Sequence, residues 1–141
     1  MYIGQYNHSI DAKNRVFLPA KYRSKHKHFI LTRGLESCLY LYDLQSWDTV
    51  LQKLEDLSLP DKMQERAFKR ALLSGANEAA PDSQGRILIP QTLCAYAGIK
   101  NEIIIIGVGN RLEIWDSTQW NAYYNQHADV SFRTLASTLE I

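Results

Sequence analysis

The sequence predicts a mainly β fold with short helices, of the α+β class, in which two related halves share one core. The chain of 141 residues carries one motif twice. The two copies are Asp11-Ala12-Lys13-Asn14-Arg15-Val16-Phe17-Leu18-Pro19 and Asp82-Ser83-Gln84-Gly85-Arg86-Ile87-Leu88-Ile89-Pro90. The correspondence continues through Gly34 and Gly107, Leu39 and Leu112, Asp43 and Asp116, and Trp47 and Trp120. A unit of roughly 45 residues is too small to bury its own core, so we expect both copies to pack together in one domain.

Each copy of the motif begins with a predicted tight turn. Its aspartate can accept hydrogen bonds from the backbone two residues on, and Asn14 and Gly85 tolerate the left-handed conformation at the fourth position. The β-rich runs 16–18 and 87–89 follow and end at prolines, which suit the first turn of a helix. We therefore expect each turn to close a hairpin, followed by short helices over 19–25 and 90–97.

A second pair of strands is predicted in each half. Residues 29–32 and 103–106 are rich in β-formers and are joined through glycine-containing turns to residues 39–42 and 111–115. Each half therefore has the order strand, turn, strand, short helix, strand, turn, strand.

Helices are predicted after both halves. Asp43 and Asp116 are suited to cap the first turns, and apolar residues recur at helical spacing after each. Residues 60–74 form another predicted helix with one basic face. The resulting organisation is a first repeat at 1–47, a helical linker at 48–75, a second repeat at 76–120 and a C-terminal helical tail at 121–141.

Positive charge is concentrated at the amino end. The formal net charge is +1, yet residues 1–28 sum to +5 and the remainder to 1 − 5 = −4. The cations of this stretch are Lys13, Arg15, Lys21, Arg23, Lys25 and Lys27. Such a cluster favours a polyanion partner, although a solvated charged face is the alternative.

Other classes of site find little support in the sequence. Cys38 and Cys94 lie outside metal-binding spacings, and His8, His26 and His28 lack a well-placed third ligand, so neither a metal nor a cofactor is expected. No apolar run approaches the ~20 residues of a membrane span and no signal peptide opens the chain, which predicts a cytoplasmic protein.

The repeated aspartate and arginine are the strongest candidates for a functional role. Asp11 can pair with Arg15, and Asp82 with Arg86, which would hold each guanidinium in one orientation. A fixed guanidinium can bind phosphate oxygens or the O6 and N7 atoms of guanine in pairs. The alternative is an ion pair that only stabilises the turn. Catalysis by an Asp11–Asp82 dyad is disfavoured, because each aspartate has an arginine that would keep it ionised.

These motifs resemble the MraZ family of bacterial transcriptional regulators. The resemblance runs from Met1 to about Trp120, with both repeats in order, through Thr32-Arg33-Gly34-Leu35, Cys38-Leu39-Tyr40-Leu41-Tyr42 and Gly107-Val108-Gly109-Asn110-Arg111-Leu112-Glu113-Ile114-Trp115 as well as the turn motifs. Asn14 departs from the glycine usual in the family.

The resemblance implies two tandem AbrB-like swapped-hairpin halves that form one pseudo-symmetric double-split β-barrel domain. It also implies a ring-shaped homo-oligomer that binds double-stranded DNA at direct repeats in the promoter of the cell-division and cell-wall gene cluster. We therefore expect a nucleoid-associated, sequence-specific repressor, not an enzyme, with DNA-binding residues Asp11, Lys13, Arg15, Lys21, Arg23, Lys25, Lys27, Asp82 and Arg86. The alternative is an oligomeric interaction scaffold or antidote-like partner that does not bind DNA.

Overall fold

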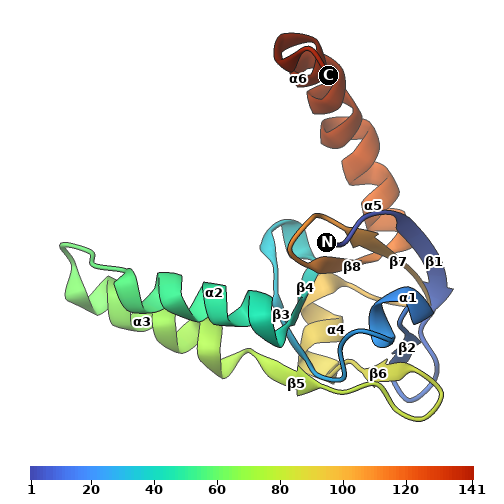
Figure 1. The fold of residues 1–141 in the computed structure, drawn as a ribbon, viewed down its shortest axis with the longest axis horizontal. Helices are drawn as coiled ribbons and strands as arrows, with labels where there is room; N and C mark the ends of the chain where they lie inside the picture. Colours follow the sequence, from blue (N-terminus) through green and yellow to red (C-terminus); the bar gives the residue numbers. More distant parts are fainter.

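A computed structural model describes all residues from Met1 to Ile141 and confirms the α+β class (Figure 1). One antiparallel sheet has the order β1-β7-β8-β4-β3-β5, and β2 and β6 form a separate two-stranded ribbon. The strands are β1 (Gln5–Ser9), β2 (Arg15–Phe17), β3 (Phe29–Arg33), β4 (Leu39–Asp43), β5 (Asn77–Ala79), β6 (Arg86–Leu88), β7 (Glu102–Gly107) and β8 (Leu112–Asp116). The large sheet is open, with β1 and β5 at its edges, so the double-split β-barrel that the resemblance implies is not a closed barrel.

The two halves exchange strands. β1 of the first half pairs with β7 of the second, and β5 of the second pairs with β3 of the first. The expectation of a local hairpin at each motif turn is therefore wrong, because the strands on either side of the turn enter different sheets. The second hairpin of each half is confirmed, since β3 pairs with β4 and β7 pairs with β8. This exchange is the swapped-hairpin arrangement that the family resemblance implies.

The β2–β6 ribbon lies on a pseudo-twofold axis. Val16 pairs with Ile87, its counterpart in the second copy of the motif. The same relation holds where β4 meets β8, because Tyr40 pairs with its counterpart Glu113. A single chain thus contains the pseudo-twofold symmetry that a dimer of two identical copies would have.

A single core joins the halves. Val16 and Ile87 are fully buried, as are Leu31 and Leu41 of the first half and Ile105 of the second. Removal of apolar surface from water contributes about 25 cal/mol per Å², and neither half could bury these side chains alone. The expectation that both copies of the motif share one core is confirmed.

Helices occupy the predicted positions and extend beyond the sheet. They are α1 (Ala20–Arg23), the 3-10 turn η1 (Leu35–Ser37), α2 (Leu44–Asp56), α3 (Lys62–Ser74), α4 (Gln91–Ala97), α5 (Ser117–Tyr123), the π-helical turn η2 (Tyr124–Ala128) and α6 (Asp129–Leu139). Asp43 and Asp116 cap α2 and α5, accepting hydrogen bonds from the backbone N–H groups of Ser46 at 2.7 Å and Gln119 at 3.2 Å. Both predicted caps are confirmed.

Two helical projections leave the body in different directions. In Figure 1, α2 and α3 lie side by side and form one projection, while α5, η2 and α6 form an arm that points away from it. None of the residues of α6 is buried. No helix has both the length and the apolar composition needed to cross a membrane.

Candidate nucleic-acid interface

The two motif turns have the same hydrogen-bonded geometry. Asp11 Oδ1 accepts hydrogen bonds from the backbone N–H groups of Lys13 and Arg15, both at 2.9 Å. Asp82 Oδ1 accepts from the backbone of Gln84 and Arg86, again at 2.9 Å. The residue at the fourth position is left-handed in both, with φ of 59° at Asn14 and 83° at Gly85. The turn conformation predicted from the motif is confirmed.

Each turn aspartate also fixes its arginine. Arg15 Nε donates to Asp11 Oδ2 at 2.8 Å, and Arg86 Nε donates to Asp82 Oδ2 at the same distance. The two terminal nitrogens of each guanidinium make no hydrogen bond within the chain and remain available to a ligand. The arginines are therefore oriented in advance, which reduces the entropy that binding would cost.

The same contacts keep the aspartates ionised. The backbone N–H of Arg15 is the largest influence that lowers the pKa of Asp11, and the backbone N–H of Arg86 acts in the same way on the pKa of Asp82. No Ser, Cys or His side chain is hydrogen-bonded to either carboxylate. Carboxylates held in this state do not supply the proton that an acid–base dyad needs.

The ribbon presents four side chains on its outer face. Arg15 lies opposite Leu88, and Phe17 lies opposite Arg86. Side chains of opposed residues, and of residues two apart on a strand, share a face, whereas Val16 and Ile87 between them point into the core. Phe17 is 43% exposed and Leu88 is 59% exposed. The outer face thus carries two arginines on one diagonal and two apolar side chains on the other.

Phe17 and Leu88 were not among the predicted site residues. The sequence did show that each lies between two aliphatic residues of the motif, an alternation typical of a strand with one buried face. What the sequence did not indicate was that both strands would lie in one ribbon with these residues on a common face.

Arg23 has a structural contact that distinguishes the two turns. Its Nε donates to the carbonyl oxygen of Leu18 at 2.8 Å. A Cβ added at Gly85 would lie only 2.3 Å from Arg23 Cζ, so the guanidinium of the first half rests on the turn of the second. The equivalent position after the second motif is Cys94, and Asn14 of the first turn instead donates through Nδ2 to Gln91 Oε1 at 3.0 Å.

Substitution of Gly85 by alanine should therefore disturb the second turn selectively. The positive φ and the displaced Arg23 guanidinium together should cost about 1–2 kcal/mol of unfolding free energy. Asn14→Gly relieves a left-handed non-glycine residue and loses one exposed hydrogen bond, so its effect should stay within about 1 kcal/mol. Urea unfolding of both variants checks this, and equal effects would contradict the role given to Arg23.

The predicted lysines lie around the ribbon to different extents. Lys13 is exposed at the tip of the first turn, where the second turn has Gln84. Lys21 lies on α1, beside the ribbon in Figure 1, with its Nζ 5.6 Å from the ring centroid of Tyr22. Lys25 and Lys27 are exposed in the connection from α1 to β3, and no hydrogen bond or ion pair joins either to a turn. Lys13 is the only one of these lysines that belongs to a motif turn.

The histidines and cysteines form no common centre. His26 Nε2 lies 3.6 Å from Asp43 Oδ2. No group of three or more potential ligands is arranged to hold a metal ion. Cys38 and Cys94 are buried and free, and burial raises the pKa of the Cys38 thiol to about 12.

The ribbon's shape and chemistry suit a nucleic-acid groove. The DNA major groove admits a two-stranded β-ribbon, guanidinium groups bind guanine edges or phosphates, and apolar side chains contact the methyl group of thymine. All three features occur on the face that carries Arg15, Phe17, Arg86 and Leu88.

Comparison with known proteins places these features in a family. The family model described as "MraZ protein, putative antitoxin-like" matches residues 1–71 and 72–140, one match for each half. A "Transcriptional regulator MraZ" of Clostridium tetani is 47% identical over 130 residues, covering 92% of this chain and 91% of the relative. The protein of the same name from Thermoanaerobacter sp. (strain X514) is 47% identical over 141 residues, covering 99% and 97%.

Proposed function

The chain belongs to the MraZ family and is a transcriptional regulator, and from this premise we propose that it binds double-stranded DNA sequence-specifically through the β2–β6 ribbon. The observation that carries the proposal is the pair of arginines, each fixed by its own aspartate on the outward face of that ribbon. The relatives compared above are named as transcriptional regulators and not as enzymes.

In the proposed complex the ribbon enters the major groove. The free terminal nitrogens of Arg15 and Arg86 contact guanine edges, while Phe17 and Leu88 contact neighbouring thymine methyl groups. Lys13, Lys21, Arg23, Lys25 and Lys27 contact phosphates, which position the ribbon without specifying sequence. Asp11 and Asp82 act through the arginines that they orient.

We further propose that several copies act together as a repressor on the nucleoid. Direct repeats in the promoter of the cell-division and cell-wall gene cluster would each receive one ribbon. Linked copies bind successive repeats at a high effective concentration, so modest contacts combine into a stable complex. A complex that covers a promoter in this way blocks transcription from it.

Single substitutions separate specific contacts from general ones. Arg15→Ala should cost about 1–3 kcal/mol in binding to the chain's own upstream region, because a paired contact to a base edge is lost. Lys25→Ala should weaken binding to all duplexes alike and reduce the slope of affinity against salt concentration. Titrations of both variants with the upstream duplex and a random duplex, at several salt concentrations, provide the measurement.

The interaction-scaffold alternative predicts a different result. Wild-type protein freed of contaminating nucleic acid would then shift the upstream duplex no better than the random one. Arg15→Ala would also leave the preference unchanged, and either outcome would remove the ribbon from the proposed site.

A further inference from the structure

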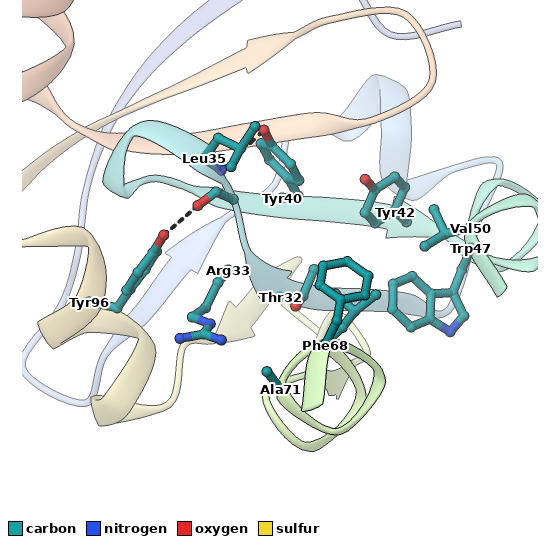
Figure 2. A pocket seen from close by; sticks show the side chains of 12 residues that line it. Thr32, Arg33, Leu35, Tyr40, Tyr42, Trp47, Val50, Phe68, Ala71 and Tyr96 are labelled. Atoms are coloured by element: carbon teal, nitrogen blue, oxygen red, sulfur yellow. Dashed lines mark hydrogen bonds between the residues drawn. The ribbon is translucent and has the colours of Figure 1, made fainter. Parts of the chain in front are cut away.

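An apolar groove opens between helices α2 and α3 and the face of the sheet that lies opposite the main core. Its volume is about 490 Å³, and Figure 2 shows Trp47 and Phe68 of the helices together with Tyr40 and Tyr42 along β4. Small-molecule sites in proteins have volumes of about 300–1,000 Å³, mostly apolar walls and a few polar groups that fix the ligand. The groove has the size and the walls of such a site.

A buried hydroxyl group faces this groove. Thr32 lies on β3, is only 2% exposed and lines the groove. Its Oγ1 takes part in none of the chain's side-chain hydrogen bonds, yet no fully enclosed side-chain oxygen or nitrogen of the chain lacks a partner. The Thr32 hydroxyl therefore keeps a little accessible surface, and that surface opens into the groove. Because buried polar groups are nearly always hydrogen-bonded, the hydroxyl marks the place for a polar group of a ligand.

The next residue, Arg33, is the only charged side chain that lines the groove. Its Cζ lies 5.6 Å from the ring centroid of Tyr96, and the Tyr96 hydroxyl donates to the carbonyl oxygen of Gly34. None of the chain's ion pairs involves Arg33. Arg33 is therefore a cation that rests on a fixed aromatic ring and has no anionic partner. A guanidinium in this state can pair with a carboxylate through two hydrogen bonds.

The charges of the two helices do not enter the groove. The acidic residues Asp48, Glu55 and Asp56 of α2 stand against Lys53, and Lys62, Arg66, Lys69 and Arg70 of α3 stand against Glu65. None of these side chains lines the groove. Charges of both signs that face solvent are screened by salt, so Arg33 decides which sign of ligand the groove favours.

We propose that this groove binds an amphipathic carboxylate, such as a fatty acid. The apolar chain lies along the aromatic walls, where each methylene removed from water favours binding. The carboxylate lies at β3, accepting hydrogen bonds from the Arg33 guanidinium and from Thr32 Oγ1. The ribbon lies away from α2 and α3 in Figure 1, so this site is separate from the proposed DNA interface.

The first test compares three ligands that share one apolar chain. Decanoate, decanol and decyltrimethylammonium are titrated into the full-length protein below the concentrations at which they form micelles, and binding is measured by calorimetry. Decanoate is expected to bind saturably, with one molecule per chain. Decanol should bind about tenfold more weakly, because it lacks the charge that pairs with Arg33, and the ammonium compound more weakly still. Equal binding of all three would show that the groove does not recognise a carboxylate.

The second test uses variants of the groove. Arg33→Gln should weaken decanoate binding about tenfold and leave decanol binding unchanged, and Thr32→Val should weaken decanoate binding about threefold. Ala71→Trp fills the groove with an indole ring and should abolish binding of both ligands. Arg66→Gln and Ser74→Trp make the same changes on α3 outside the groove and serve as controls. Melting temperatures verify that each variant folds.

Three results would each overturn the proposal. One is the absence of saturable decanoate binding by the wild type, which is also expected if a peptide or another copy of the chain fills the groove. The second is wild-type affinity in Ala71→Trp, and the third is an unchanged preference for decanoate over decanol in Arg33→Gln. A variant with both Arg15 and Arg86 replaced by alanine should bind decanoate as the wild type does, which separates this site from DNA binding.

Discussion

Replacement of both Arg15 and Arg86 by alanine is expected to weaken binding to the specific duplex by a factor of about 10² to 10⁴. Each arginine carries about 1–3 kcal/mol of discrimination if it makes a paired contact to a base, and the two contacts lie on separate turns. Binding to random DNA should fall much less, because the phosphate contacts of the lysines remain. The double variant should therefore lose nearly all preference for its target.

Two comparison variants make this result specific. Arg133→Ala removes an arginine with a similar ion pair, at 3.1 Å from Asp129, on the exposed arm, and should leave DNA affinity unchanged. Replacement of both Arg15 and Arg86 by lysine keeps the positive charge but removes the planar guanidinium group. Affinity for random DNA should therefore persist, while the preference for the specific duplex falls. Fluorescence anisotropy with both duplexes gives the affinities. Full discrimination by the lysine variant would show that charge alone suffices at the turns.

Gly107→Ala is expected to destabilise the protein by about 2–4 kcal/mol and to lower its melting temperature by on the order of 10 °C. A Cβ at this position would lie 2.3 Å from the backbone nitrogen of Ile3 and 2.4 Å from the carbonyl carbon of Tyr2. Backbone atoms cannot move aside as a flexible side chain does. The amino-terminal segment would have to leave its place, exposing Tyr2, which is buried and hydrogen-bonded to Asp43.

Gly75→Ala provides the matched control. The closest atom to its added Cβ is the carbonyl oxygen of Ala71 at 3.2 Å, so a small shift accommodates it. Its effect should stay within about 1 kcal/mol, since alanine also restricts the unfolded chain. Thermal and urea unfolding of both variants measure the difference. Equal stability of the two would show that the segment around Ile3 is not held against Gly107.

Local features of the fold could be predicted from the sequence because they depend on neighbouring residues. The turn pairs of Asp11 with Arg15 and Asp82 with Arg86 span four residues, and the caps at Asp43 and Asp116 span three. Helical spacing of apolar residues likewise located α2 and α3. In each case the residues that make the structure are close enough in the chain for their pattern to be recognised.

Features that depend on distant residues were not predictable from the residues alone. Pairing of β1 with β7 joins segments about 100 residues apart, and nothing in either strand excludes a local partner. The contact of Arg23 with Gly85 and the common face of Phe17 and Leu88 both depend on how β2 meets β6. Resemblance to a family supplied the strand exchange, and the double-split β-barrel that it implies has an open sheet here.

The joining of both turns in one chain has a consequence for the kind of DNA site that the proposed binding mode would favour. Two separate identical chains must present identical tips, and their twofold axis favours palindromes. Here Lys13 and Asn14 of one turn correspond to Gln84 and Gly85 of the other, so each turn can change by mutation without altering its counterpart. If the ribbon binds DNA as we propose, it has a polarity along the duplex, and sites repeated in one orientation should match it better than inverted ones.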